Sequence, residues 1–427
     1  MLRRYAWDKV RAELQCYRRR EPEKTELYQI VSHGRELLPV VWEERFQWQY
    51  GVLRDEVLRT FDAYLNCGLL CHGAARVYCD QCRHSFLVAF SCKTRGVCPS
   101  CAAKRAVKFA EHLYDQVLEK VPHRHIVFST PKRIRAYLRY DRKLNDILFR
   151  AAWGSIQECL SEPAGEPGAV LTLQTAGEAL NHNPHLHGIL TDGLFMADGS
   201  FKSFEKLDCE RLNSSFSDRV LSALHKRELI SDEVTTQIMS QQHTGFSVWV
   251  GEPFEDSESK HFVARYIERG PLSLEKLSIY DDIITYTTKD GTAHEFDALE
   301  FLAQLSSQIP RPYESLTRYY GYYSCRARGK RKKLNATTEA EQQAVAEKPA
   351  KSSSSWAACL QRIYEINPLE CPNCKSEMRI IAFIQDPHEL NTIMESLGIE
   401  KYRSPPPIPD YSSYDESMFQ DFIPDYD

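Results

Sequence analysis

Two short cysteine pairs place the tightest constraint on how this 427-residue chain can fold. They are Cys79-x2-Cys82 and Cys98-x2-Cys101, and fifteen residues separate the second cysteine of one from the first cysteine of the other. Each pair can form a knuckle that presents two thiolates to one ion, and a tetrahedral zinc site needs two knuckles. Because the spacing lies in the range of zinc ribbons, we predict one structural Zn²⁺ site made by Cys79, Cys82, Cys98 and Cys101.

Other cysteine and histidine residues leave the identity of the four zinc ligands open. The nearby residues that could replace a ligand are Cys67, Cys71, His72, His84 and Cys92. A third pair, Cys371-x2-Cys374, has the form of a knuckle without a partner, and only Cys359 and His388 lie in its own segment to complete it. A metal-free half site is at least as compatible with this pair as a second zinc site.

The composition is that of a globular protein with several cores. The chain is 42% hydrophobic and 26% charged, and its length suffices for two or three domains. It has no apolar run long enough to span a bilayer, no apolar leader at its start, and 14 cysteines that suit a reducing compartment. We therefore expect a cytoplasmic protein without a membrane partner.

Apolar spacing predicts an α+β protein. Residues 27–66 have helical spacing, in two helices around Gly51, short strands surround the first cysteine pair, and a helix is predicted over 102–121. Beyond Pro122, strand-like and helical runs alternate. The predicted strands are 125–129, 170–174, 186–191 and 247–250, the longest predicted helix is 134–160, and a hairpin at 283–288 precedes a helix at 297–305.

Changes in composition divide the chain into six predicted segments. They are an N-terminal helical region (1–66), a zinc-ribbon domain with its following helix (67–121), a central α+β domain (122–325), a basic and polar linker (326–355), a small module with the third cysteine pair (356–402) and an acidic tail (403–427). We expect the tail to be disordered, because it is acidic and contains several prolines.

The segment His185-Leu186-His187 is the candidate metal-binding strand of the central domain. Residues two apart on a strand face the same side, so both imidazoles can reach one divalent ion while Leu186 enters the core. An Mg²⁺ or Mn²⁺ ion held there would polarise a phosphate. For the third ligand we favour Gln174 on the preceding strand, with His182 as the alternative. Two structural histidines are the competing interpretation.

Tyr266 is the candidate nucleophile. It lies in a predicted helix over residues 260–269, which ends before Gly270-Pro271. A phenol with an ordinary pKa of about 10 needs deprotonation or a cationic neighbour to attack phosphorus, and Arg265 and Arg269 carry positive charge beside it. An apolar face on the same helix makes a core tyrosine the competing interpretation.

Five motifs together resemble those of the HUH-class rolling-circle transposases named after insertion sequence ninety-one. They lie at residues 97–101, 183–192, 264–271, 318–324 and 363–374, within a similarity that covers roughly residues 60–385. The resemblance implies an N-terminal zinc-binding domain and an antiparallel nuclease sheet flanked by helices. It also implies that His185 and His187 bind the metal and that Tyr266 cleaves DNA, leaving a 5′-phosphotyrosine and a free 3′-hydroxyl.

One position departs from the family pattern. Members with two catalytic tyrosines space them four apart, and the corresponding residue here is Phe262, which cannot act as a nucleophile. A cycle with a single tyrosine, recruitment of Tyr280 or Tyr286, and a degenerate zinc-dependent DNA-binding protein remain open. A replication initiator or conjugative relaxase would use the same chemistry, but the paired cysteine knuckles disfavour it.

Basic and aromatic residues near the end of the central domain predict a DNA-binding surface. Phosphate contacts from arginine and lysine combined with base stacking are typical of proteins that bind single strands. The predicted DNA-binding residues are Arg265, Arg269, Arg326, Arg328, Lys330 and Arg331, with stacking by Tyr319, Tyr320, Tyr322 and Tyr323. For the basic run at 326–333 and these tyrosines, a packed aromatic segment followed by a solvated linker is the competing interpretation. The expected partner is DNA, as single strands or hairpin element ends, whereas the sequence does not indicate an oligomeric state.

Overall fold

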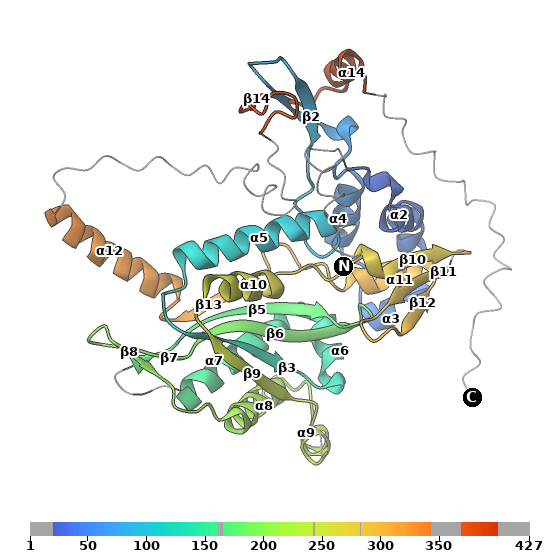
Figure 1. The fold of residues 1–427 in the computed structure, drawn as a ribbon. Coiled ribbons are helices and arrows are strands. Elements are labelled where there is room, and N and C mark those ends of the chain that lie inside the picture. Colours follow the sequence, from blue (N-terminus) through green and yellow to red (C-terminus); the bar gives the residue numbers. More distant parts are fainter. Residues whose placement is uncertain are drawn as a thin grey trace, which may run out of the picture.

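The computed structural model describes residues 20–342 and 369–399, apart from 161, 163–164, 242–243 and 282. Its central feature is a five-stranded antiparallel sheet in the order β13-β5-β6-β3-β9 (Figure 1). The strands are β3 (His123–Ser129), β5 (Gly168–Ala176), β6 (His182–Thr191), β9 (Ser247–Phe254) and β13 (Thr317–Gly321). The four strands predicted in the central domain are thus present, and the α+β prediction is confirmed. Cys359 and the acidic tail lie outside the described residues.

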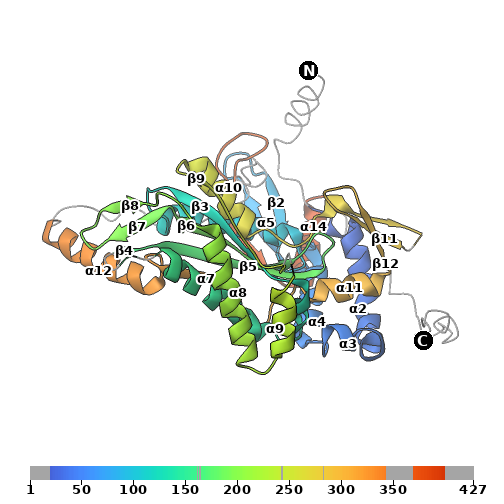
Figure 2. The same ribbon diagram turned by 90° about the horizontal axis from the view of Figure 1, so that it is seen from below.

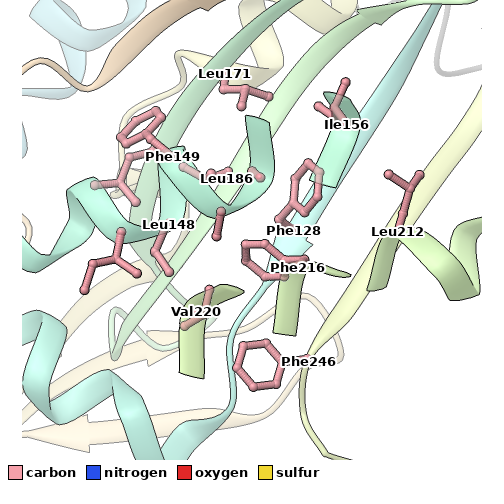
Figure 3. Packing of buried hydrophobic residues seen from close by; sticks show 14 of the residues in the cluster. Phe128, Leu148, Phe149, Ile156, Leu171, Leu186, Leu212, Phe216, Val220 and Phe246 are labelled. Carbon is pink, nitrogen blue, oxygen red and sulfur yellow. The ribbon is translucent and has the colours of Figure 1, made fainter. Parts of the chain in front are cut away.

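One face of this sheet packs on helices and forms the largest hydrophobic core. Alternate residues of the central strands, such as Leu171 and Leu186, point into it, and both are fully buried. Phe128 from β3 contacts Phe216 with their ring centroids 4.9 Å apart (Figure 3). The covering helices are α7 (Asn145–Leu160), α8 (Cys209–His225) and α9 (Asp232–Met239). Burial of these side chains fixes which face of each strand is left for polar groups.

The opposite face lies beneath α5 (Pro99–Gln116) and α10 (Ser257–Ile267), which contact each other (Figure 1). Ala264 and Ile267 of α10 are buried with Leu113 of α5 and with Val170 and Ile189 of the sheet. Because α10 contributes small and branched side chains at this contact, it lies close to β6. The same helix therefore places its remaining polar residues above the strand that carries the histidine pair.

A second core joins the N-terminal helices to a later part of the chain. It combines α2 (Glu26–Arg45), α3 (Gln47–Tyr50) and α4 (Asp55–Leu65) with a small sheet and α11 (Ala298–Ser306) (Figure 2). The strands of that sheet are β10 (Leu277–Tyr280), β11 (Ile283–Thr287) and β12 (Ala293–Phe296). Residues 272–309, which the sequence placed in the central domain, therefore complete the N-terminal body instead.

The segment that carries the third cysteine pair is not a separate module. Its strand β14 (Arg379–Ile384) pairs antiparallel with β1 (Ala74–Tyr78), which also pairs with β2 (Ser85–Ala89). Helix α14 (Pro387–Ser396) adds Leu390 and Met394 to the small core under this sheet. The C-terminal segment thus completes the sheet of the predicted zinc ribbon.

Two predicted segments differ in form from the structure. The single helix predicted over 134–160 is broken at Asp141, whose backbone is extended and whose carboxylate accepts a hydrogen bond from the Lys143 N–H. The predicted linker begins instead as α12 (Cys325–Gln342), because its lysine and arginine residues are good helix formers. At Asp141, the helix predicted over 134–160 is divided into two separate elements, α6 (Lys132–Tyr140) and α7.

The remaining elements are short. They are the 3₁₀ turns Pro22–Lys24, Leu70–His72, Arg142–Leu144 and Leu274–Lys276 and a small sheet of β4 (Gly165–Glu166), β7 (Gly193–Met196) and β8 (Phe201–Ser203). Among the described residues, no helix combines the length and apolarity needed to cross a bilayer.

Candidate functional site

The two predicted imidazoles lie side by side on the central strand β6. His185 is paired across the sheet with Gln174 and His187 with Thr172, so both face the side covered by α10. Leu186 between them is fully buried in the opposite core. The ring centroids of the two histidines are 4.8 Å apart. This alternation is the one that the strand pattern predicted.

A hydrogen bond at Nδ1 orients each of these imidazoles. His185 Nδ1 lies 2.6 Å from the carbonyl oxygen of Asn183, and His187 Nδ1 lies 3.0 Å from His125 Nε2. A metal-binding histidine commonly has its second ring nitrogen held in this way, which fixes the tautomer and the ring orientation. Both histidines therefore keep Nε2 as the nitrogen that can bind a metal.

His125 is a site residue that the sequence analysis did not single out. It lies on β3, next to β6, and its ring stacks on His187 with the centroids 5.2 Å apart. His125 begins the predicted strand 125–129, and in the structure it alternates with His123 along β3, but the pairing of that strand with β6 could not be predicted from the sequence. The site therefore contains three imidazoles.

Burial keeps these imidazoles neutral. It lowers the pKa of His187 to about 2, with smaller contributions from His185, His125 and Arg269, and it lowers the pKa of His125 to about 4. Burial also lowers the pKa of His185. A neutral imidazole with a free nitrogen is the form that binds a metal. The donor set therefore fits a divalent ion.

Tyr266 lies against two of the three imidazoles, those of His187 and His125. Its ring centroid is 5.4 Å from that of His187 and 5.8 Å from that of His125, in both cases edge to face. Arg269, one turn later, places its guanidinium carbon 4.3 Å from the centre of the tyrosine ring. The Tyr266 residue is half-buried. Helix α10 thus brings together the phenol, a cation and the imidazoles.

Gln174 faces the same site, and its amide fastens α10 to the sheet. Its Nε2 donates hydrogen bonds to the carbonyl oxygens of Tyr266 at 3.2 Å and Ile267 at 2.9 Å. With that nitrogen engaged, Oε1 is the atom left to bind a metal. His182, the alternative, is buried, and neither ring nitrogen has a partner among the described residues. Burial and Arg142 lower its pKa.

A carboxylate two residues after the tyrosine also belongs to this region. Glu268 is half-buried, and it accepts a hydrogen bond from Thr317 Oγ1 at 3.4 Å. Burial raises its pKa, whereas the nearby Arg95 and Arg105 oppose that shift. Glu268 could not be singled out from the sequence, because a lone glutamate at a helix end resembles any surface residue.

The other aromatic residues considered as nucleophiles have different surroundings. Phe262 lies one turn before Tyr266 on α10 and is 64% exposed. Tyr280 is 78% exposed on the small sheet of the N-terminal body. Tyr286 is buried in the second core, and its hydroxyl accepts a hydrogen bond from the Ser273 N–H.

The predicted DNA-binding residues divide into exposed and packed groups. Arg265, Arg326 and Lys330 are exposed on α10 and α12, and Arg269 is exposed just after α10, where it lies over the Tyr266 ring. Arg328 and Arg331 are half-buried and lie over the rings of Tyr319 and Tyr322, the latter guanidinium 3.5 Å from the ring centre.

The tyrosines of β13 and of the turn after it are mostly packed inside the protein. Tyr323 is fully buried and its hydroxyl lies 2.7 Å from His123 Nε2, while Tyr322 stacks on Phe195 and Tyr320 stacks on Trp153. The prediction that these tyrosines stack on bases is therefore wrong for Tyr323, and rings with protein neighbours on one face have little surface for a base.

The four predicted zinc ligands do not form one site. Cys98 and Cys101 lie with Cys67 and Cys92, whereas Cys79 and Cys82 lie with Cys371 and Cys374. The reason is the β1–β2 hairpin. Cys79 and Cys82 are in its turn, while Cys67 and Cys92 are near its open end, and a strand of five residues separates these ends by roughly 16 Å.

The first cluster is built into the second core. Cys67 Sγ is 3.7 Å from Cys98 Sγ and 3.8 Å from Cys101 Sγ, and Cys92 Sγ is 3.5 Å from Cys101 Sγ. Hydrogen bonds from the neighbouring thiols hold the pKa of Cys67 well below its ordinary value. Two of the residues considered as replacement ligands, Cys67 and Cys92, therefore belong to the site. Four thiols at these separations fit a tetrahedral zinc ion.

Two family models match the chain, one over most of the central sheet and one over the first cysteine cluster. A family model described as a putative transposase matches residues 168–332, which include the histidine pair and Tyr266. A model described as a transposase zinc-binding domain matches residues 40–130, which include all four thiols of the first cluster. No solved structure matches the chain significantly.

Two curated proteins are similar over most of their lengths. A transposase for insertion sequence element IS801 from Pseudomonas savastanoi pv. phaseolicola is 24% identical over 357 residues, which are 78% of this chain and 85% of that protein. A putative transposase, y4qJ, from Sinorhizobium fredii is 25% identical over 316 residues, which are 67% of this chain and 79% of that protein. The chain therefore belongs to the transposase family of insertion sequence ninety-one, and a zinc-binding domain precedes its five-stranded sheet.

Proposed function

We propose that this transposase nicks and rejoins single-stranded DNA through a covalent bond between Tyr266 and a 5′-phosphate. The observation that carries the proposal is the position of the tyrosine ring, 5.4 Å from His187 and directly beneath the guanidinium of Arg269. A phenol, a cation and a pair of neutral imidazoles are the groups that phosphoryl transfer to tyrosine requires.

The histidine pair would hold Mg²⁺ or Mn²⁺ through the Nε2 atoms of His185 and His187, with Gln174 Oε1 as the proposed third donor. Bound there, the ion would withdraw electron density from the phosphate oxygens and stabilise the charge that develops on them. His125 and the Asn183 carbonyl hold the two imidazoles at Nδ1.

The proposed chemical step uses Tyr266 of α10 and Arg269, which lies just after this helix. The Tyr266 oxygen attacks phosphorus, the bond from phosphorus to the 3′-oxygen breaks, and the phenolic proton is transferred in net terms to that oxygen. Arg269 places a positive charge beside the reacting groups, which would stabilise the negative charge of the phosphate. The phosphodiester energy is kept in the tyrosine ester, so a 3′-hydroxyl can reverse the step without a nucleotide cofactor.

An adduct assay tests the proposal directly. The full chain is incubated with 5′- or 3′-labelled single-stranded DNA from an element end and Mn²⁺, then denatured. We expect the label to stay on the protein only when it lies on the 3′ side of the nick, since that fragment carries the 5′-phosphate. Binding of the DNA without any adduct would instead support a zinc-dependent DNA-binding protein.

Gln174 offers a test of how the tyrosine is positioned. We expect Gln174→Leu to lower the rate of adduct formation at saturating DNA by about 10²-fold, because the end of α10 loses both hydrogen bonds to the sheet. The dissociation constant for DNA should be unchanged. Gln174→Glu separates two roles: a carboxylate can bind a metal but cannot donate to the two carbonyls. Recovery of activity in this variant would show that metal binding matters more than positioning.

Trp249 is an exposed aromatic residue beside the site. It lies on the edge strand β9, is 54% exposed, and its ring centroid is 5.3 Å from that of His125. A base next to the cleaved phosphate can stack on it, and such stacking contributes about 1–3 kcal/mol per base. We expect Trp249→Ala to weaken single-stranded DNA binding by about 5- to 150-fold.

A matched control for this variant is Trp48→Ala, since Trp48 is also exposed but lies on α3 in the N-terminal body. Fluorescence anisotropy with a labelled oligonucleotide measures both affinities. Trp249→Phe keeps an aromatic face and should retain most of the binding. Equal losses in the two alanine variants would contradict a specific role for Trp249.

A further inference from the structure

We propose that Cys79, Cys82, Cys371 and Cys374 form a second structural Zn²⁺ site, which closes a zinc ribbon from two distant parts of the chain. Only the first two of these residues lie within the segment matched by the zinc-binding family model, which ends at residue 130. The other two come from the C-terminal segment, 289 and 295 positions away from their nearest thiols. The inference does not depend on the proposed cleavage chemistry.

The distances between the sulfur atoms fit one tetrahedral ion. Cys79 Sγ lies 3.5 Å from Cys374 Sγ, and Cys82 Sγ lies 3.3 Å from Cys371 Sγ. All four sulfur atoms are within 4.8 Å of one another. Thiolates about 2.3 Å from a zinc ion in a tetrahedron are roughly 3.8 Å apart, so little movement is needed to bind one.

The two cysteine pairs have the same backbone structure. In the first pair, the Cys79 N–H donates to the His84 carbonyl and the Arg83 N–H donates to the Cys79 carbonyl, both at 2.9 Å. The second pair repeats both bonds at the same distances. There the Cys371 N–H donates to Ser376 and the Lys375 N–H donates to Cys371. Two segments of unrelated sequence have thus adopted the same knuckle.

Each knuckle also contains a residue in the left-handed region at the same position. Arg83 has a φ of 64° and Lys375 has a φ of 61°, and each directly follows the second cysteine of its pair. This conformation costs a non-glycine residue free energy, so it persists where the surroundings compensate. A shared ion that requires both thiolates of each knuckle to point inward provides that compensation.

The strands that carry the knuckles hold them face to face. Tyr78, just before the first knuckle, pairs with Arg379, just after the second, and Arg379 Nε also bonds Asp80 at 2.7 Å. The core behind the thiols is small, with Val77, Val88 and Met378 as its buried members besides two of the cysteines. The same sheet has another small core, which includes Leu390 and Met394 of α14, and the ion would add to the free energy that these two cores supply for docking β14.

Zinc analysis of the full-length protein tests the proposal. Purified under reducing conditions, the wild-type chain is expected to contain two zinc ions. Cys82→Ser and Cys374→Ser, from opposite ends of the chain, should each reduce this to one, and the double variant should lose no more than either alone. The matched control is Cys325→Ser, which replaces an exposed cysteine outside both clusters and should keep two ions.

A second measurement on the wild-type chain does not depend on how the variants fold. When Co²⁺ replaces zinc in the wild-type chain, the thiolate-to-cobalt absorption per chain should correspond to eight sulfur ligands rather than four. A wild-type chain that holds one ion, or retention of two ions by Cys82→Ser or Cys374→Ser, would overturn the proposal. A disulfide between the pairs would appear as thiols missing from a titration and would overturn it as well.

Discussion

Replacing Tyr266 with phenylalanine is expected to remove the covalent protein–DNA adduct, with a loss of roughly 10³-fold or more in cleavage rate. The substitution deletes only the hydroxyl, so the ring contacts with His187 and Arg269 can persist. Binding of single-stranded DNA should therefore change little. Adduct formation is measured by denaturing electrophoresis, and binding by anisotropy with the same oligonucleotide.

Two controls separate the nucleophile from other causes of inactivity. Tyr280→Phe removes a hydroxyl from an exposed tyrosine of the N-terminal body and should leave the adduct at its wild-type level. His185→Ala should abolish cleavage and leave the zinc content unchanged, because its imidazole lies on β6 and belongs to neither cysteine cluster. An adduct that persists in Tyr266→Phe but disappears in Tyr280→Phe would assign the chemistry to the other tyrosine.

The sequence could predict the part of this site that depends on local periodicity. The alternation of His185 and His187 along a strand followed from the buried Leu186 between them, and the helix around Tyr266 followed from its apolar face. His125 could not be found in this way, because its role depends on the pairing of β3 with β6. Strand pairing is a long-range property that a local pattern does not encode.

The cysteine clusters show the same limit more sharply. The spacing of the pairs was correct for a single zinc ribbon, but it does not say which knuckles meet. The five-residue strand β2 separates Cys79 from Cys92, and β14 returns from nearly 300 residues later to complete the sheet. The cysteines that lie beside Cys371 and Cys374 are Cys79 and Cys82, which are distant in sequence, so the segment around Cys371 could not reveal them.

The placement of residues 272–309 could not be predicted for a related reason. Residues 272–309 follow the central domain in sequence, yet Phe301 and Leu302 are fully buried against the N-terminal helices. Gly34 of α2 lies so close to the Leu302 side chain that an added methyl group would be 2.5 Å from it. Composition marks where a segment is apolar, but it does not identify the surface that the segment covers.

Loss of the first zinc site is expected to destabilise the N-terminal body as a whole. Cys67, Cys98 and Cys101 are buried among residues from α2, α4 and α11, so the ion would lie inside a core that these elements share. Structural zinc sites contribute about 10–16 kcal/mol of apparent binding free energy, comparable with the whole stability of a domain. Replacing one ligand should remove several kcal/mol of this, which corresponds to a fall in melting temperature of about 10 °C or more.

Cys101→Ser tests this expectation with little change in side-chain volume. Thermal unfolding followed by circular dichroism, together with zinc content, should show a lower first transition and the loss of one ion. The matched control is Cys159→Ser, because Cys159 is half-buried against the main core on α7 and belongs to neither cluster. Since the second cluster has two exposed thiols and a small core, Cys374→Ser should lower the transition less than Cys101→Ser does. The reverse order would mean that the helical body is stable without its ion and that the ribbon supports it.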